Sequence, residues 1–312
     1  MKKIFKVLTY LLLVILALVI SFCALSYRAD VPVAELKAKY ATAESRFMDL
    51  DGMVVHYRDE GNPADKTPIV LLHGTAASLL TWNGWTTALK TEHRVIRLDL
   101  PGYGLTGPNP AQDYSMNFYI RFLHDFLGKL DVNRFYLAGN SLGGKIAWEY
   151  ALAFPDNVKK LILIDAAGYP LAHGKPLVIR LASTPVLKNI LLYVTPKFLV
   201  EKSLKEVYAD DYKVTEQLVE QYYDMACRAG NRAAFVARAG IVDGDDYLKI
   251  NHIQTPTLIL WGESDAWIPV ENAYKFEKDL PNNRVVIFRN LGHIPQEENP
   301  SGTIKEVLAF VK

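Results

Sequence analysis

Short apolar runs rich in β-branched residues alternate along this chain of 312 residues with longer amphipathic segments. Each run is bounded by glycine, proline or charged residues and predicts a β-strand; the runs are 53–57, 68–72, 94–99, 135–139, 160–165, 257–261 and 284–288. The segment 116–130 has an aromatic or apolar residue at every fourth position from Phe118 to Leu130, and Ser115 before it suits a helix N-cap. Strands that alternate with amphipathic helices predict an α/β fold, with a mostly parallel central sheet and helices on both faces.

The alternation stops between Gly168 and about Ile250. This stretch lacks a strand-like run, and its periodicity predicts helices over 185–193, 196–207, 214–227 and 232–242. We expect these helices to form a lid over the carboxyl edge of the sheet, where open α/β sheets bind ligands. The chain is accordingly divided into an N-terminal segment (1–29), a core (30–168 and 251–312) and a helical cap (169–250), with 30–45 as a linker or first helix.

The N-terminal segment carries no charge from Val7 to Tyr27. At 1.5 Å per residue a helix of this length, about 21 residues, spans a bilayer. Lysines at positions 2, 3 and 6 precede it, which predicts a single-pass anchor with a cytoplasmic N-terminus and an extracytoplasmic catalytic part. The small residues in Ala24-Leu25-Ser26 leave a cleaved signal peptide open, which would give a secreted or periplasmic protein.

Charge and cysteine content narrow the class of partner. There are 35 Lys and Arg against 34 Asp and Glu, and removing the three N-terminal lysines leaves a net charge of −2. Nucleic acid is therefore not expected as a partner, and a small-molecule substrate fits better. The two cysteines, Cys23 and Cys227, have no metal-ligand spacing, and one lies within the apolar leader, so neither a disulfide, a metal nor a cofactor is expected.

The segment Gly139-Asn140-Ser141-Leu142-Gly143 matches the G-x-S-x-G motif, which presents a nucleophilic serine. It lies between a predicted strand and a predicted helix, as the G-x-S-x-G elbow of a serine hydrolase does. The turn is so tight that side chains two residues before and after the serine would collide, hence the glycines. Ser141 is the predicted nucleophile, at a helix N-terminus that favours negative charge.

A serine needs a base, and histidine titrates near neutral pH. His293 follows the last predicted strand in a loop, where it can reach the carboxyl edge of the sheet. Asp265, after the preceding strand, is the predicted acid that orients it, with Glu263 as the rival. The order serine, acid, histidine is the one expected for this architecture.

The oxyanion of the reaction requires preorganised donors. The backbone N–H of Leu142, directly after the nucleophile, is one predicted donor. The N–H of Thr75 is the other, in the turn that follows the strand ending at His73-Gly74. His73 itself is interpreted as a structural turn residue.

These motifs resemble the α/β-hydrolase superfamily from about Arg46 to Lys312. The resemblance rests on five segments in order: His73-Gly74-Thr75, Asp99 to Gly104, Gly139 to Gly144, Gly262 to Asp265 and Gly292-His293. It implies a helical cap inserted after the sixth strand and a capped, serine-nucleophile, esterase- or lipase-like enzyme. Haloalkane dehalogenases and soluble epoxide hydrolases carry aspartate where this chain has Ser141, which argues against both activities.

A carboxylesterase or lipase-like activity on a small or lipophilic ester is therefore expected. The Gly-Asn-Ser-x-Gly-Gly elbow also resembles carbon–carbon hydrolases of ring-cleavage products. An amidase or iminopeptidase would need acidic lid residues, for which Glu201, Glu206, Asp210 and Asp211 are available. A non-catalytic ligand receptor on the same fold is an alternative of another class.

Overall fold

A sheet of eight strands runs through the computed structural model, which describes residues 2–171 and 174–312. Their order is β1-β2-β4-β3-β5-β6-β7-β8, and only the pairs β1–β2 and β2–β4 are antiparallel. The strands are β1 (Ser45–Leu50), β2 (Met53–Gly61), β3 (Ile69–Leu72), β4 (Arg94–Leu98), β5 (Phe135–Asn140), β6 (Val158–Ile164), β7 (Thr257–Gly262) and β8 (Asn283–Phe288). The mostly parallel sheet is confirmed. The sequence pattern missed β1, an edge strand in which only Leu50 is buried.

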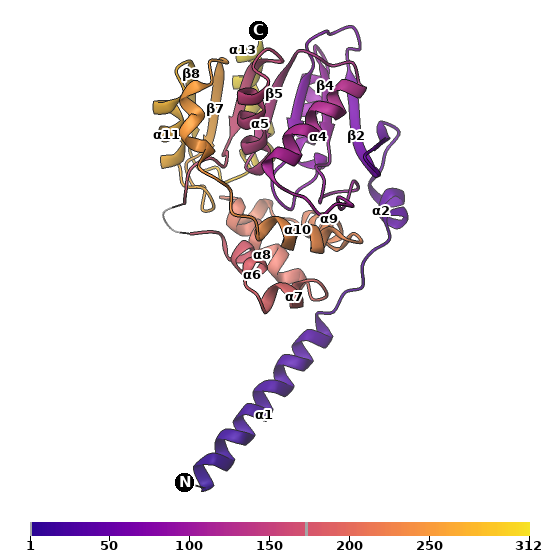
Figure 1. Ribbon diagram of the computed structural model, residues 1–312, viewed down its shortest axis with the longest axis vertical. Helices are drawn as coiled ribbons and strands as arrows, with labels where there is room; N and C mark the ends of the chain where they lie inside the picture. The colour runs from indigo at the N-terminus through magenta and orange to yellow at the C-terminus, as the bar shows by residue number, and fades with distance from the viewer. Residues whose placement is uncertain (1, 172–173) are drawn as a thin grey trace.

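Helices cover both faces of the sheet, as expected. Alternate residues of each strand point to opposite faces, so Ile69 and Leu71 join one apolar cluster and Val70 and Leu72 the other. The first cluster includes side chains of α3 (Asn83–Leu89) and α13 (Pro300–Val311); the second includes those of α4 (Met116–Lys129), α5 (Leu142–Ala153) and α11 (Glu271–Asp279). Figure 1 shows α4 and α5 in front of the strands and α13 behind them.

In the described part of the segment between β6 and β7, five α-helices lie at one end of the sheet (Figure 1). They are α6 (Leu177–Ser183), α7 (Leu187–Leu191), α8 (Lys197–Val207), α9 (Glu216–Cys227) and α10 (Asn231–Ala239), and we call them the helical insertion. The last four match the helices expected from periodicity, although α7 is shorter. The pattern missed α6, which has only seven residues and one buried side chain, Ala182.

The N-terminal helix α1 (Lys2–Leu25) projects from the end of the molecule that carries the helical insertion (Figure 1). It buries no residue and is long and apolar enough to cross a membrane, as an anchor or a signal sequence would be. Residues 27–31 then run against the insertion: Arg28 N donates to Tyr193 O (3.2 Å), Val31 N donates to Cys227 O (2.8 Å), and Asp30 pairs with Arg232. Helix α2 (Val33–Tyr40) follows, within the segment expected to be a linker or first helix.

Candidate active site

Ser141 occupies a sharp turn between β5 and α5. Its backbone has φ 53° and ψ −115°, a region that non-glycine residues rarely adopt and that is common at functional sites. A Cβ atom on Gly139 would lie 2.2 Å from Gly143 O, and one on Gly143 would lie 2.2 Å from Leu72 O. Both glycines are therefore required by backbone contact. The contact at Gly139 lies within the turn, as the sequence suggested, whereas the contact at Gly143 is with the end of β3.

The carboxylate of Asp265 and the ring of His293 are joined by a hydrogen bond. Asp265 Oδ2 lies 2.7 Å from His293 Nδ1, while Oδ1 accepts from the N–H groups of Trp267 (2.8 Å) and Ile268 (2.9 Å). The other ring nitrogen, His293 Nε2, is buried and has no hydrogen-bond partner among the residues that the structure describes. The rival acid Glu263 is exposed. The carboxylate that contacts the histidine ring is thus that of Asp265.

His293 and Ser141 line the same cavity at the carboxyl edge of the sheet, which has a volume of about 160 Å³. Its wall is overwhelmingly apolar and is contributed largely by the helical insertion, with Val178, Leu191, Leu199, Val200, Phe235 and Val236 among its side chains. One guanidinium, that of Arg232, also lines it. The structure therefore brings the predicted serine, acid and histidine together beneath the insertion, next to an apolar space.

The two predicted oxyanion donors lie beside Ser141. Leu142 is the first residue of α5, and N–H groups of a first helical turn have no acceptor within their own helix. Thr75 follows β3, and both residues line a second cavity together with Ser141. His73 stabilises this turn: its Nδ1 donates to Gly74 O (2.7 Å) and its Nε2 accepts from Leu100 N (2.9 Å). Burial lowers the pKa of His73, which favours the neutral ring that these bonds require.

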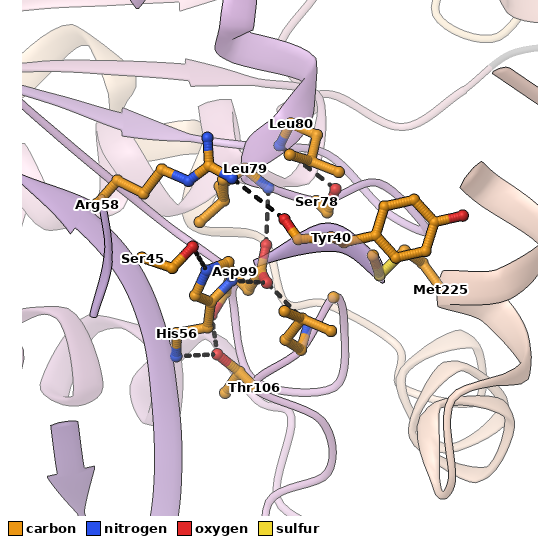
Figure 2. A network of polar contacts seen from close by, with 12 residues as sticks. Tyr40, Ser45, His56, Arg58, Ser78, Leu79, Leu80, Asp99, Thr106 and Met225 are labelled. Carbon is orange, nitrogen blue, oxygen red and sulfur yellow. Dashed lines mark hydrogen bonds and ion pairs between the residues drawn. The ribbon is translucent and has the colours of Figure 1, made fainter. Parts of the chain in front are cut away.

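A buried carboxylate, Asp99, holds the segments behind that turn (Figure 2). It accepts hydrogen bonds from Leu79 N (2.7 Å) and Leu105 N (2.8 Å), and lies 2.7 Å from His56 Nδ1. Burial alone would raise the pKa of Asp99, but the neighbouring His56 and the donors outweigh it and lower the pKa. His56 Nε2 in turn lies 2.9 Å from Ser45 Oγ. Asp99, His56 and Ser45 thus form a second chain of acid, histidine and serine. Ser45 lies on the edge strand β1 and lines neither cavity, so we interpret this network as structural.

Two side chains that the sequence analysis did not single out hold His293 in place. Asn140, directly before the nucleophile, donates from Nδ2 to His293 O (2.9 Å) and to Ile164 O (3.1 Å). Glu298 accepts from Gly292 N (2.8 Å) and from two N–H groups after α8, those of Ala209 (3.1 Å) and Asp210 (3.0 Å). The histidine loop is thus tied to the nucleophile strand and to the helical insertion.

A second acid, Asp165, lies at the end of β6 beside Asp265. It is fully buried, and its Oδ1 accepts from Gly262 N (2.9 Å). Burial, followed by the charge of Asp265, raises the pKa of Asp165 well above its usual value. One ligand atom each from Asp165, Asp265 and His293 lie within 4.8 Å of one another, a spacing that can hold a metal ion. Asp265 Oδ2 and His293 Nδ1 already pair with each other, and the raised pKa of Asp165 disfavours the carboxylate form that a metal ion requires. We therefore interpret the cluster as a hydrogen-bonded set.

Comparison with known proteins gives the family. A family model described as the alpha/beta hydrolase fold matches residues 67–300, so the chain belongs to the α/β-hydrolase family. Human monoacylglycerol lipase ABHD6 is 27% identical over 282 residues, 85% of this chain and 83% of that protein. The 2-hydroxy-6-oxo-2,4-heptadienoate hydrolase of Pseudomonas putida is 29% identical over 257 residues, 78% of this chain and 88% of that protein.

A solved structure is similar over the whole length. It is described as a membrane phospholipase A and bacterial virulence factor, has 27% identity and a TM-score of 0.72, and the match covers 100% of this chain and 98% of that one. The related proteins are hydrolases with different substrates. The chain is therefore a hydrolase of the α/β fold.

Proposed function

We propose that the protein is a serine esterase that hydrolyses a lipophilic acyl ester through an acyl-enzyme on Ser141. Ser141 Oγ attacks the ester carbonyl carbon while His293 Nε2 accepts the hydroxyl proton, and Asp265 stabilises the imidazolium. The N–H groups of Leu142 and Thr75 bind the oxyanion. Collapse breaks the bond to the alcohol oxygen, which takes the proton from His293. Water, deprotonated by His293, then releases the acid and restores Ser141.

The observation that carries the proposal is the hydrogen bond between Asp265 and His293 Nδ1. The other ring nitrogen, Nε2, is buried and has no hydrogen-bond partner among the described residues. His293 and Ser141 line the same cavity. A base with a free ring nitrogen can take a proton from a hydroxyl group. Among the hydroxyl residues that line this cavity, Ser141 is the one on the sharp turn after β5. The apolar wall of the cavity fits an acyl chain, because burying its CH₂ groups there is favourable by about 0.8 kcal/mol each.

The test uses the full chain in detergent and p-nitrophenyl esters of increasing acyl length. We expect kcat/KM to rise with chain length until the cavity is full, and Ser141→Ala to lose at least about 10³-fold in kcat. A fluorophosphonate probe should label the wild type and not Ser141→Ala. A Ser141→Ala variant with wild-type turnover and an unchanged circular dichroism spectrum would refute the proposal.

A carbon–carbon hydrolase is the second candidate, favoured by the similarity to the Pseudomonas putida enzyme. Turnover of 2-hydroxy-6-oxo-dienoates with negligible ester hydrolysis would select it. An iminopeptidase has less support, because none of Glu201, Glu206, Asp210 and Asp211 is among the described residues that line either cavity.

We further propose that α1 is an uncleaved anchor with its N-terminus in the cytoplasm and the hydrolase outside it. Three lysines before the apolar stretch and the absence of burial within α1 support this orientation. Fractionation followed by N-terminal sequencing decides between anchor and signal: a mature chain beginning near Tyr27 would contradict the anchor. Protease accessibility in sealed vesicles tests the orientation.

A further inference from the structure

A second cavity, of about 170 Å³, lies beside Ser141 and differs from the first in charge. Of the residues that the structure describes, three cationic side chains line it: Lys145 from α5, Lys175 from the segment before α6, and Arg238 from α10. They come from parts of the chain that are far apart in sequence. None of them takes part in the proposed triad chemistry, so their position beside Ser141 indicates a role other than catalysis.

Two of the three cations have little solvent exposure, and each pairs with an acid. Lys145 is 5% exposed, and its Nζ lies 2.8 Å from Glu149 Oε1. The Arg238 side chain is 11% exposed and donates from one nitrogen to both oxygens of Asp243 (2.8 and 3.0 Å). Its Nε is buried without a hydrogen-bond partner among the described residues. Removing charged groups from water is costly unless they are paired. The Arg238 Nε at this cavity, unpartnered among the described residues, therefore remains available to a ligand.

The third cation leaves the cavity with an excess of positive charge. Lys175 is exposed, and its Nζ donates to a backbone carbonyl, Ala239 O (3.3 Å), with no acid as partner among the described contacts. Three cations therefore stand against two acids, and of those acids only Asp243 is in the lining.

Two further features favour an anion here. Leu171, Ile179 and Ile241 contribute apolar wall, and a lower local dielectric strengthens the attraction between charges. The first turn of α5 also borders the cavity at Leu142, and its free N–H groups favour negative charge. Both effects strengthen the attraction of an anion to this positively charged cavity.

We propose that this second cavity is a binding site for a negatively charged group on the alcohol part of the ester, with phosphate as the preferred anion. The proposal rests on the proposed esterase function. The acyl chain occupies the apolar cavity, the ester carbonyl lies at Ser141 and Thr75, which line both cavities, and the charged alcohol extends past Trp267 toward Arg238 and Lys175. The substrate class is then an acyl ester of a phosphorylated alcohol, such as an acylated glycerol phosphate.

The experiment compares two substrates that share one acyl chain, decanoyl glycerol and decanoyl glycerol 3-phosphate, with the full chain in detergent. The quantity measured is the ratio of kcat/KM on the charged substrate to that on the neutral one. In the wild type this ratio should exceed one. Lys175→Gln and Arg238→Gln should each lower it by about tenfold, the equivalent of one charge-assisted hydrogen bond. Asp243→Asn removes an acid and should raise it.

Lys278→Gln is the matched control, because it removes an exposed lysine on α11, outside both cavities, and should leave the ratio unchanged. A ratio that does not respond to the three site variants, or that responds equally to Lys278→Gln, would overturn the subsite while leaving the esterase proposal standing. Arg238→Gln can also disturb folding, but Lys175→Gln and Asp243→Asn change exposed or partly exposed side chains and keep the test decisive.

Competition with soluble compounds identifies the anion and works even if neither ester is turned over. Glycerol 3-phosphate should slow fluorophosphonate labelling of Ser141 more than glycerate, and glycerate more than glycerol. Stronger protection by glycerate would replace phosphate with a carboxylate as the preferred anion and contradict that part of the proposal. Equal protection by all three would reject an anion site, whereas absence of any labelling would count against the proposed function itself.

Discussion

Asp165 and Asp265 lie at the ends of the neighbouring strands β6 and β7 with carboxylate oxygens within 4.8 Å of each other. Two buried negative charges this close repel. Asp265 accepts hydrogen bonds from the N–H groups of Trp267 and Ile268 and lies 2.7 Å from His293 Nδ1. The raised pKa of Asp165 follows from burial and from this neighbour. Burial and the neighbouring charge therefore both favour the protonated form of Asp165.

We expect Asp165→Asn to change how stability depends on pH. Because the pKa of Asp165 is raised in the folded state, its contribution is complete at low pH and is lost as pH rises from about 4 through the folded pKa. Asparagine does not ionise, so the free energy of unfolding of the variant should fall less over that range. Urea denaturation between pH 4 and 8 measures the difference. Asp156→Asn, an exposed site, is the control, and parallel profiles for Asp165→Asn and wild type would contradict the prediction.

Asp265→Asn should lower kcat by roughly 10³–10⁴-fold with little change in stability. If the amide oxygen keeps the N–H groups of Trp267 and Ile268, the amide NH₂ faces His293 Nδ1. The ring then carries its proton on Nε2 and cannot accept the proton of Ser141. Hydrolysis of a p-nitrophenyl ester, together with thermal unfolding, measures both effects. Glu263→Gln, two residues earlier and exposed, should stay within about twofold of wild type. The reverse result would make Glu263 the acid.

Gly139→Ala should destabilise the protein by about 3 kcal/mol or more, because the new methyl group would meet backbone atoms that cannot move aside. Gly128 provides a contrast: it is exposed in α4, and a Cβ there would meet nothing within 4 Å. Gly128→Ala should stabilise by about 0.5–1 kcal/mol through helix propensity. Chemical denaturation measures both, and similar values for the two variants would disprove the steric argument.

Glu298→Gln should lower both activity and the stability of the histidine loop. The carboxylate accepts from Gly292, Ala209 and Asp210, and an amide NH₂ would face at least one of these donors. We expect kcat to fall by about tenfold or more and hydrogen exchange to increase in residues 290–295 and 207–211 together. Glu306→Gln, on the exposed side of α13, is the control. Faster exchange in only one of the two segments would show that they are not coupled.

The sequence alone predicts those residues of the candidate site that belong to short motifs directly after a strand. Ser141, Asp265 and His293 each follow a strand, so topology places them at one edge, and the glycines at 139 and 143 identify the tight turn. Asn140 and Glu298 were missed because the contacts that show their roles are long-range: Asn140 reaches His293, 153 residues away, and Glu298 reaches Asp210, 88 residues away. The convergence of Lys145, Lys175 and Arg238 depends on how the helical insertion packs on the core, which periodicity does not specify. Strand β1 and helix α6 were missed because each buries almost nothing.

Residues 27–31 are fastened to the helical insertion by backbone hydrogen bonds and by the Asp30–Arg232 pair. If α1 is the proposed membrane anchor, this attachment would restrict rotation of the hydrolase relative to α1 and would keep the insertion facing the lipid surface. Substrate supply would then be two-dimensional. Turnover would follow the surface density of the ester in the membrane, and diluting the vesicles at constant lipid composition would leave the rate per enzyme unchanged.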